Sequence, residues 1–408
     1  MAEVLGEKGK KEAKKEAMKE ILKELHRGLP LEEAKKRFLS EIGNISSVEI
    51  AEIEQSLINE GISIDIIKEF CNVHSLLFES TLKEAVKSGT KPNHPVFLFN
   101  KENREIEKLV NSIEESINVS NIQDFKTRLK EKLEKLKEID KHYERKEQLL
   151  FPYLEKYNFM GPSKVMWGKH NDIRALWKKA VNEIDAVNES NRKKFINEVI
   201  LPLIDEVLGM ITKEENILFP TALEKLSDED WIEILKQSDE IGYCFIDVPK
   251  NIQFIIDEYN TVLSPEVAIK DNSIVQFPTG ELTARELNYI INTLPVDITF
   301  IDSEDRVKYF SDNKTRIFTR TKSVIGRKVQ NCHPPKSVDA VEKILKSFRD
   351  GTKNSYDFWL NIGGRFIYIR YFAVRDKNRN YLGTLEVTQD ITDVRKLEGE
   401  KRLLDMDD

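Results

Sequence analysis

The chain is short of cysteine and contains no long apolar run. Its 408 residues include three cysteines, Cys71, Cys244 and Cys332, which are too few and too far apart for a disulfide framework. No stretch approaches the roughly 18 uncharged apolar residues of a membrane span, and no signal peptide opens the sequence. We therefore expect a cytoplasmic protein of a reducing compartment, without a membrane partner.

An excess of positive charge is missing as well. The 64 Lys and Arg residues are outnumbered by 71 Asp and Glu residues, which leaves a formal net charge of −7. Domains that bind nucleic acid usually carry a basic patch and a high pI, so we expect no nucleic-acid partner. No Gly-rich phosphate loop follows a strand pattern, and no spacing of Ser, Cys, His and Asp indicates a catalytic triad. We predict no catalytic residues, and a binding role rather than an enzymatic one.

Apolar residues make up 40% of the chain, which is enough for sizeable cores. At about 150 residues per domain, the length suggests two to three domains. Helical spacing dominates the first half, whereas alternating strands with polar turns follow near the end, where Gly363-Gly364 is a strong hairpin signal. In chain order we predict an all-helical unit (12–90), a helical bundle (91–226), a connector (227–281) and an α+β domain with a five-stranded antiparallel sheet (282–397).

Two segments within the predicted bundle are copies of each other. HYERKEQLLFPYLEK begins at His142, and MITKEENILFPTALEK begins at Met210, with an offset of 68 residues. A duplicated helix pair that is too short to bury its own apolar face packs on its copy. We therefore predict an antiparallel four-helix bundle with approximate twofold symmetry.

Three segments resemble known families. The duplicated LLFP and ILFP motifs, each ending ten residues after a His or its counterpart, resemble the hemerythrin-like (HHE) family. The segments LPVDITFIDSEDRVKYFS, IGRKVQNCHPPKSV and GTLEVTQDITD resemble a PAS domain, and the first 90 residues resemble the DUF438 domain. This domain order is the one found in DUF438 family proteins.

The hemerythrin resemblance implies a metal site in the bundle. It places four residues at ligand positions: His94, His142, His170 and Glu214. Lys146 stands where the family has Glu, and Met210 stands where it has His. A charged lysine cannot ligate a cation, and a thioether is a weak ligand for ferric iron, so we expect a single iron or similar divalent ion rather than a di-iron centre. Lys146, Met210 and His74 of the N-terminal unit are possible additional contributors.

Two alternatives remain open for the same residues. In the first, Lys146 projects inward and forms an ion pair with Glu214, the histidines are hydrogen-bonded core residues, and the bundle is a metal-free scaffold. In the second, haem is held between His142 and Met210, a reading that we do not favour because no haem-attachment motif is present.

The resemblances imply a sensor or signalling protein. The bundle would respond to metal, oxygen, nitric oxide or redox state, and the PAS domain would bind a ligand that the resemblance does not identify. No output domain follows the PAS segment, so we expect the state to pass to a signalling partner protein or to a homodimer through PAS. The alternative is an iron-handling or iron-centre repair protein with redox activity, because the HHE family includes such factors.

Overall fold

The computed structural model describes residues 94–247, 274–313 and 316–400, together with residues 29–42 and isolated positions between 13 and 61. The chain divides into two compact units, Met1–Tyr259 and Asn260–Asp408. In the N-terminal part, helix α2 (Leu31–Glu41) starts directly after Pro30, and its Phe38 side chain is buried. None of the helices described in these ranges is long and apolar enough to cross a membrane.

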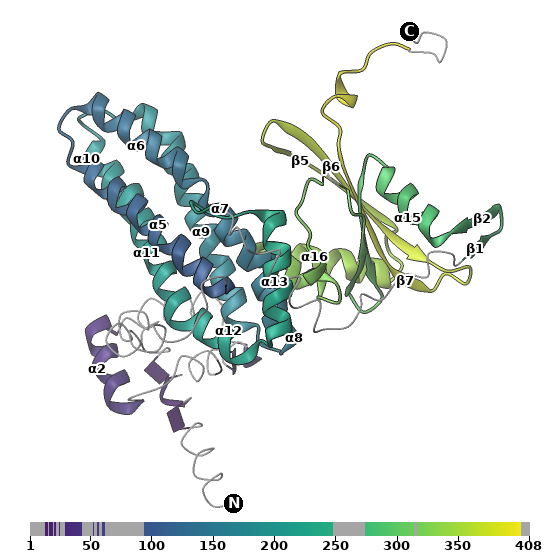
Figure 1. Cartoon of the computed structure of the whole chain (residues 1–408), viewed down its shortest axis with the longest axis horizontal. Coiled ribbons are helices and arrows are strands. Elements are labelled where there is room, and N and C mark those ends of the chain that lie inside the picture. The colour runs from purple at the N-terminus through teal and green to yellow at the C-terminus, as the bar shows by residue number, and fades with distance from the viewer. Residues whose placement is uncertain are drawn as a thin grey trace, which may run out of the picture. The chain divides into compact units, whose positions relative to one another are not determined.

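Residues 95–225 form four long helical segments. The first is α5 (Pro95–Ile117). The second contains α6 (Ile122–Leu136), α7 (Ile139–Arg145), η1 (Lys146–Leu150) and α8 (Phe151–Lys156), and the third contains α9 (Gly161–Glu183) and η2 (Ile184–Ala186). The fourth contains α10 (Arg192–Phe195), η3 (Ile196–Ile200), α11 (Leu201–Lys213), η4 (Glu214–Leu218) and α12 (Phe219–Lys225). Because α5 and α9 each pack against both α6 and α11, the helices close into the predicted four-helix bundle (Figure 1).

Three turns of the bundle are π-helical, and each ends two residues before a proline. The turns η1, η3 and η4 precede Pro152, Pro202 and Pro220. A proline inside a helix has no N–H to donate, and its ring clashes with the carbonyl group four residues earlier. We attribute the wider turns to this clash, since a π-helical turn bonds to the fifth residue instead of the fourth. Two of these turns begin at Lys146 and Glu214, the equivalent positions of the two copies.

A fifth helix, α13 (Asp228–Ile241), packs against the bundle, although we expected this segment to belong to a connector. Ser227 and Asp230 form a reciprocal capping box at its start, which satisfies backbone N–H groups of the first turn. Trp231 and Ile234 are buried in the same apolar core as the four-helix bundle. The predicted connector (227–281) therefore starts too early, because its first residues form α13.

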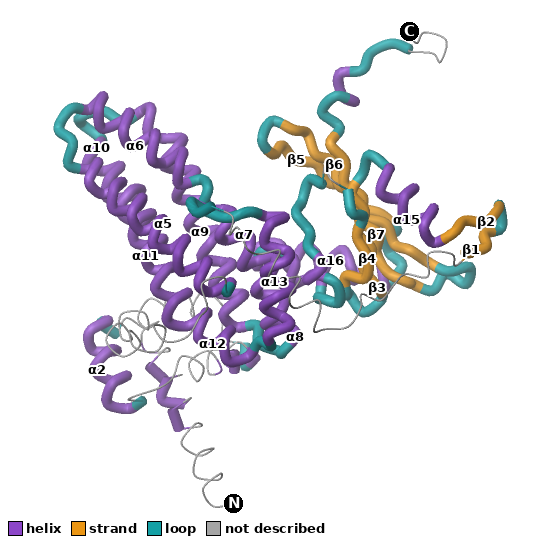
Figure 2. The backbone as a smooth tube through the Cα atoms, viewed as in Figure 1, coloured by secondary structure: helices purple, strands orange, loops and turns teal. Residues whose placement is uncertain are grey.

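The second unit contains the following elements: β1 (Ile274–Phe277), β2 (Gly280–Thr283), α15 (Ala284–Thr293), β3 (Asp297–Asp302), β4 (Val307–Phe310), η5 (Lys322–Val324), η6 (Val329–Cys332), α16 (Pro335–Arg349), β5 (Ser355–Ile362), β6 (Arg365–Arg375), β7 (Tyr381–Asp390) and η7 (Val394–Lys396). Strands β1 and β2 pair as a separate hairpin, whereas the other five form an antiparallel sheet in the order β4-β3-β7-β6-β5 (Figure 2). Helix α16 packs against β7, and its Leu345 lies in an apolar cluster with Ile301 and Val329. The predicted five-stranded sheet is confirmed.

Two glycine positions shape this sheet. Gly363 and Gly364 join β5 to β6 with φ angles of 54° and 79°, the left-handed conformation that a two-residue hairpin turn requires. In β7, Gly383 has a φ of 153° and lies so close to β3 that an added Cβ would overlap the Ile301 carbonyl oxygen and lie 2.9 Å from the Phe300 ring. No other side chain fits this position without separating β3 from β7.

We expect Gly383→Ala to destabilise the sheet domain by about 2–4 kcal/mol, because overpacking adds to an unfavourable backbone conformation. Gly351→Ala is the matched control, since Gly351 also has a positive φ but, within the described part of the chain, nothing lies within 4 Å of its added Cβ. The control should cost about 1–2 kcal/mol. Thermal unfolding of the two variants, followed by near-ultraviolet circular dichroism, tests this difference, and equal losses would contradict it.

Candidate functional sites

His142 lies at the centre of the bundle between two carboxylates. Its Nδ1 is 2.8 Å from Glu102 Oε2, and its Nε2 is 2.9 Å from Glu214 Oε2. The other oxygen of Glu214 accepts a hydrogen bond from the Lys146 ammonium group. All four side chains are sealed from solvent. Both ring nitrogens of His142 are therefore engaged within the protein.

The ion pair between Lys146 and Glu214 joins the equivalent positions of the two copies. Burial raises the pKa of Glu214, but Lys146 and then His142 outweigh this effect and lower it to about 2. Burial also lowers the pKa of Lys146, and the Glu214 carboxylate opposes that shift. Lys146 additionally lies 4.5 Å from the centre of the Tyr143 ring. The structure thus contains the Lys146–Glu214 contact that the scaffold alternative required.

Glu102 is held from two further directions. Its Oε1 accepts hydrogen bonds from Arg145 Nη1 at 2.6 Å and from the backbone N–H of Cys244 at 2.7 Å. The Arg145 guanidinium group lies between the rings of Phe99 and Tyr243, at 4.3 and 4.4 Å from their centres. The segment after α13 therefore helps to close the bundle centre.

His170 belongs to a neighbouring cluster on α9. Its Nδ1 lies 2.7 Å from Glu147 Oε1, which also accepts from Arg174 at 2.9 Å. The His170 ring stacks on Tyr143 with 4.1 Å between ring centres. Burial lowers the pKa of His170 well below its usual value, so the imidazole is neutral. Among the described residues, its buried Nε2 has no hydrogen-bond partner.

The other predicted site residues lie elsewhere. His94 is the N-cap of α5, where its Nδ1 accepts from the Val96 N–H at 3.2 Å, and its ring contacts Trp231. Burial lowers the pKa of His94 to about 4. Met210 is buried in the apolar core of the bundle. His74 lies outside the described residues.

The residues present do not fit a hemerythrin-type iron centre. Among the side chains that the structure describes, no group of three His, Cys, Asp or Glu is arranged so that it could hold a metal ion, although Glu102 and Glu214 flank His142 on its two ring nitrogens. Glu214 is committed to Lys146 and His142, and the Lys146 ammonium group brings a positive charge to the carboxylate that would otherwise ligate a metal. His142 has no free nitrogen for haem either, and Met210 packs among apolar side chains. The bundle centre is a neutralised charge network built by the chain itself.

Sequence reasoning did not select Glu102, Tyr143 or Arg145. A signal for Glu102 was present, because it lies three residues after Phe99 and four before Ile106, on the apolar face of α5. A charged residue on such a face needs a buried partner. No comparable local signal marks Arg145, whose partners come from α5 and from the segment after α13.

A second polar site lies inside the sheet domain. Five polar side chains occupy one face of the adjacent strands β3 and β7, and each is at most 4% exposed: Asp297, Thr299, Thr384, Glu386 and Thr388. We call this set the polar inner face. An interior sheet face is usually apolar, because burying a polar group without a partner costs free energy. The polar inner face therefore requires partners.

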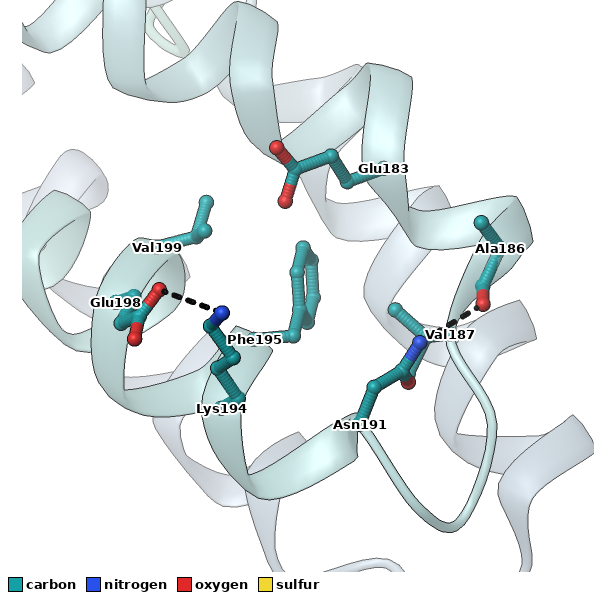
Figure 3. Close-up of a pocket in the computed structure, with 8 residues that line it drawn as sticks. All are labelled: Glu183, Ala186, Val187, Asn191, Lys194, Phe195, Glu198 and Val199. Atoms are coloured by element: carbon teal, nitrogen blue, oxygen red, sulfur yellow. Dashed lines mark hydrogen bonds and ion pairs between the residues drawn. The ribbon is translucent and has the colours of Figure 1, made fainter.

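A surface pocket of about 280 Å³ lies at the end of the bundle, between η2 and the start of the fourth helical segment (Figure 3). Its lining residues are Glu183, Ala186, Val187, Asn191, Lys194, Phe195, Glu198 and Val199. Lys194 lies 4.0 Å from Glu198, and Asn191 donates to the Ala186 carbonyl group at 3.2 Å. Lys194, Glu198 and Asn191 are thus engaged within the lining itself, and this lining contains no histidine or cysteine.

Family comparisons follow the predicted domain order. Residues 18–84 match a family of unknown function, DUF438. Residues 94–222 match the hemerythrin HHE cation binding domain, and residues 287–392 match a PAS domain. A search of curated proteins gave no significant match.

Several solved structures are similar to part of the chain. A C-terminal domain from Streptococcus mutans is 35% identical, and the match covers 32% of this chain and 100% of that one, with a TM-score of 0.31. A PAS domain of a protein from Colwellia psychrerythraea is 14% identical over 27% of this chain and 97% of that one, with a TM-score of 0.22. A sensory box sensor histidine kinase from Vibrio cholerae is 9% identical over 26% and 90%, with a TM-score of 0.21.

Proposed function

The chain belongs to the DUF438 family proteins that carry a hemerythrin-like and a PAS domain, and we propose that it is a sensor or signalling protein that binds a small polar molecule inside its PAS domain. The polar inner face carries this proposal. Part of this face is bonded within the protein, as Thr384 is to the Tyr381 hydroxyl group at 2.7 Å. The Thr388 hydroxyl group, however, is buried without a hydrogen-bond partner among the described residues, and a polar ligand would supply one. The binding state would pass to a partner protein or to a second copy of the PAS domain.

In this proposal the hemerythrin-like bundle is a metal-free scaffold. Lys146 supplies the positive charge that the buried Glu214 carboxylate needs, as Arg145 does for Glu102, and the donor set supports neither an iron-dependent response nor an iron-repair activity. The few cysteines of the chain favour action in a reducing compartment such as the cytoplasm.

Equilibrium dialysis of the full chain against a small-molecule cell extract tests the proposal, with mass spectrometry of the protein-bound fraction. We expect wild-type protein to enrich a low-molecular-weight compound. Thr388→Leu should abolish this enrichment by filling the interior, whereas Thr352→Leu at an exposed position should retain it. Sedimentation velocity with and without the extract then reports whether the bound state changes self-association. Failure of wild type to enrich any compound would contradict the proposed function.

A further inference from the structure

Part of the polar inner face has a structural explanation. The Arg316 guanidinium group donates to the Ser311 carbonyl oxygen at 2.7 Å, to the Phe318 carbonyl oxygen at 3.1 Å and to Thr299 Oγ1 at 3.0 Å. Asp297 accepts a hydrogen bond from the Ile317 N–H at 2.7 Å. These contacts fix the segment after β4 against β3, so Asp297 and Thr299 need no ligand.

Arg320 and its neighbours on β7 are different. Arg320 Nη2 lies 3.6 Å from Glu386 Oε2, which is beyond hydrogen-bond distance, and the two side chains are only 9% and 5% exposed. Within the described ranges of the chain, the buried Arg320 Nε and Thr388 Oγ1 have no hydrogen-bond partner. Arg320 Nε and the Thr388 hydroxyl group are therefore buried and unbonded, and both lie near the Glu386 carboxylate: Arg320 approaches it to 3.6 Å, and Thr388 follows it by two residues on the same face of β7. Leaving such groups unsatisfied costs free energy that a ligand recovers.

Two further groups border this set. Burial lowers the pKa of His333 to about 4, so its imidazole is neutral. The charges of Glu386, Arg320 and Arg327 also act on this pKa. Tyr371 is paired with Glu386 in the β6–β7 register, and burial raises its pKa. Neither group supplies a charge at neutral pH. Arg316 and Asp297 are also close, but they are bonded within the protein, so Arg320 and Glu386 are the neighbouring cation and anion that a ligand can meet.

We propose that the PAS interior binds a free α-amino acid, a proposal that rests on the proposed function above. Nε and Nη2 form one edge of the Arg320 guanidinium group, which suits a carboxylate through two parallel hydrogen bonds. Glu386 accepts from the α-ammonium group, and Thr388 completes the hydrogen bonds of the bound molecule. The charges of an α-amino acid are separated by a single carbon atom, which matches a cation and an anion 3.6 Å apart.

The same pair of charges discriminates against other classes of small molecule. A simple carboxylate or an inorganic phosphate would meet Arg320 but would place its negative charge beside the buried Glu386. An amine without a carboxylate would leave the Arg320 edge unbonded. Only a compound that carries both charges on neighbouring groups satisfies both residues.

Isothermal titration calorimetry of the full chain tests this proposal, with the common α-amino acids as probes. Each amino acid is compared with its decarboxylated amine and its N-acetyl derivative. We expect at least one amino acid to bind, and neither of its two derivatives to bind. Arg320→Gln and Glu386→Gln should each weaken binding about tenfold or more, since each removes a buried charge-assisted interaction. Arg370→Gln, at an exposed position of the neighbouring strand β6, is the matched control and should leave the affinity unchanged.

The variants distinguish the two proposals. If Arg320→Gln does not fold by circular dichroism, Arg320→Lys replaces it, because lysine keeps the charge but lacks the planar fork. Equal binding of the amine or the N-acetyl derivative, or an unchanged affinity in the Arg320 variant, would overturn the amino-acid assignment. Enrichment of another class of compound from the cell extract would also overturn it while leaving the proposed function intact. No binding of amino acids together with no enrichment from the extract would overturn both.

Discussion

Replacing Lys146 by methionine should lower the free energy of unfolding of the bundle by about 3–5 kcal/mol, because it leaves the buried Glu214 without its cation. The methionine side chain fills nearly the same volume, so the loss reports the charge and not a cavity. Chemical denaturation followed by far-ultraviolet circular dichroism measures the change. Lys135→Met is the matched control on the same helical segment, since the Lys135–Glu131 pair is mostly exposed and contributes about 0–1 kcal/mol.

The pH dependence of stability provides a second measurement of the same pair. Native Glu214 has a pKa of about 2 against a usual value of 4.5, so the native state binds its proton less tightly than the unfolded state. Its stabilising contribution is therefore complete above about pH 4.5 and is lost as the pH falls toward about 2. The Lys146→Met variant should lose this part of the acid dependence. A small loss of stability, similar to that of the Lys135 control, would show that the buried pair is unimportant for the fold.

Combining Lys146→Met with Glu214→Gln separates the pair from its surroundings. Because the double variant leaves no unpaired carboxylate at position 214, we expect it to recover part of the stability that Lys146→Met loses. If the loss of unfolding free energy in the double variant equals the sum of the losses in Lys146→Met and Glu214→Gln, Lys146 and Glu214 are not directly coupled.

The fold followed from the sequence because its signals are local. The copies that begin at His142 and Met210 predicted two equivalent helices, and both copies contain the π-helical turn that precedes the Phe-Pro motif. Gly363-Gly364 likewise predicted a hairpin from two adjacent residues. Helix α13 had a local signal too, the Ser227–Asp230 capping box, which the neighbouring Pro and Gly residues obscured.

The site was less predictable because its contacts join distant segments. Glu102 meets His142 across 40 positions and the Cys244 N–H across 142 positions. The family resemblance placed His94 with the other ligands, but Pro95 starts α5 and leaves His94 as its N-cap, about 12 Å along the helix axis from Glu102. In the sheet, whether Glu386 faces inward depends on the pairing of β7 with β3, which alternation alone does not determine.

The bundle retains the outer supports of a metal site although its inner residues do not form one. Glu102 holds Nδ1 of His142, and Glu147 holds Nδ1 of His170, as carboxylates commonly do for histidines that ligate metals. The departures from the hemerythrin pattern are concentrated at Lys146 and Met210. Restoring these two positions should therefore suffice to create a site that binds iron.

We expect the double variant Lys146→Glu, Met210→His to bind close to one equivalent of iron or more, whereas wild-type protein retains far less. The variant places His and Glu one helical turn apart in both copies, so each pair reaches the same interior space. Elemental analysis and absorption spectroscopy of protein purified without oxygen measure the difference. The control variant is Lys135→Glu with Met166→His, which adds the same two ligand types at positions outside the duplicated motif.

Two outcomes would overturn this account of the bundle. Near-stoichiometric iron in wild-type protein that disappears in His142→Ala would mean that the Lys146–Glu214 pair opens to admit a metal. A folded double variant without iron would mean that the interior lacks the space or the geometry for an ion. The account is supported if the double variant binds iron and neither the wild-type protein nor the control variant does. In that case Lys146 replaces the metal in the native bundle, because its ammonium group neutralises the Glu214 carboxylate that a metal would otherwise bind.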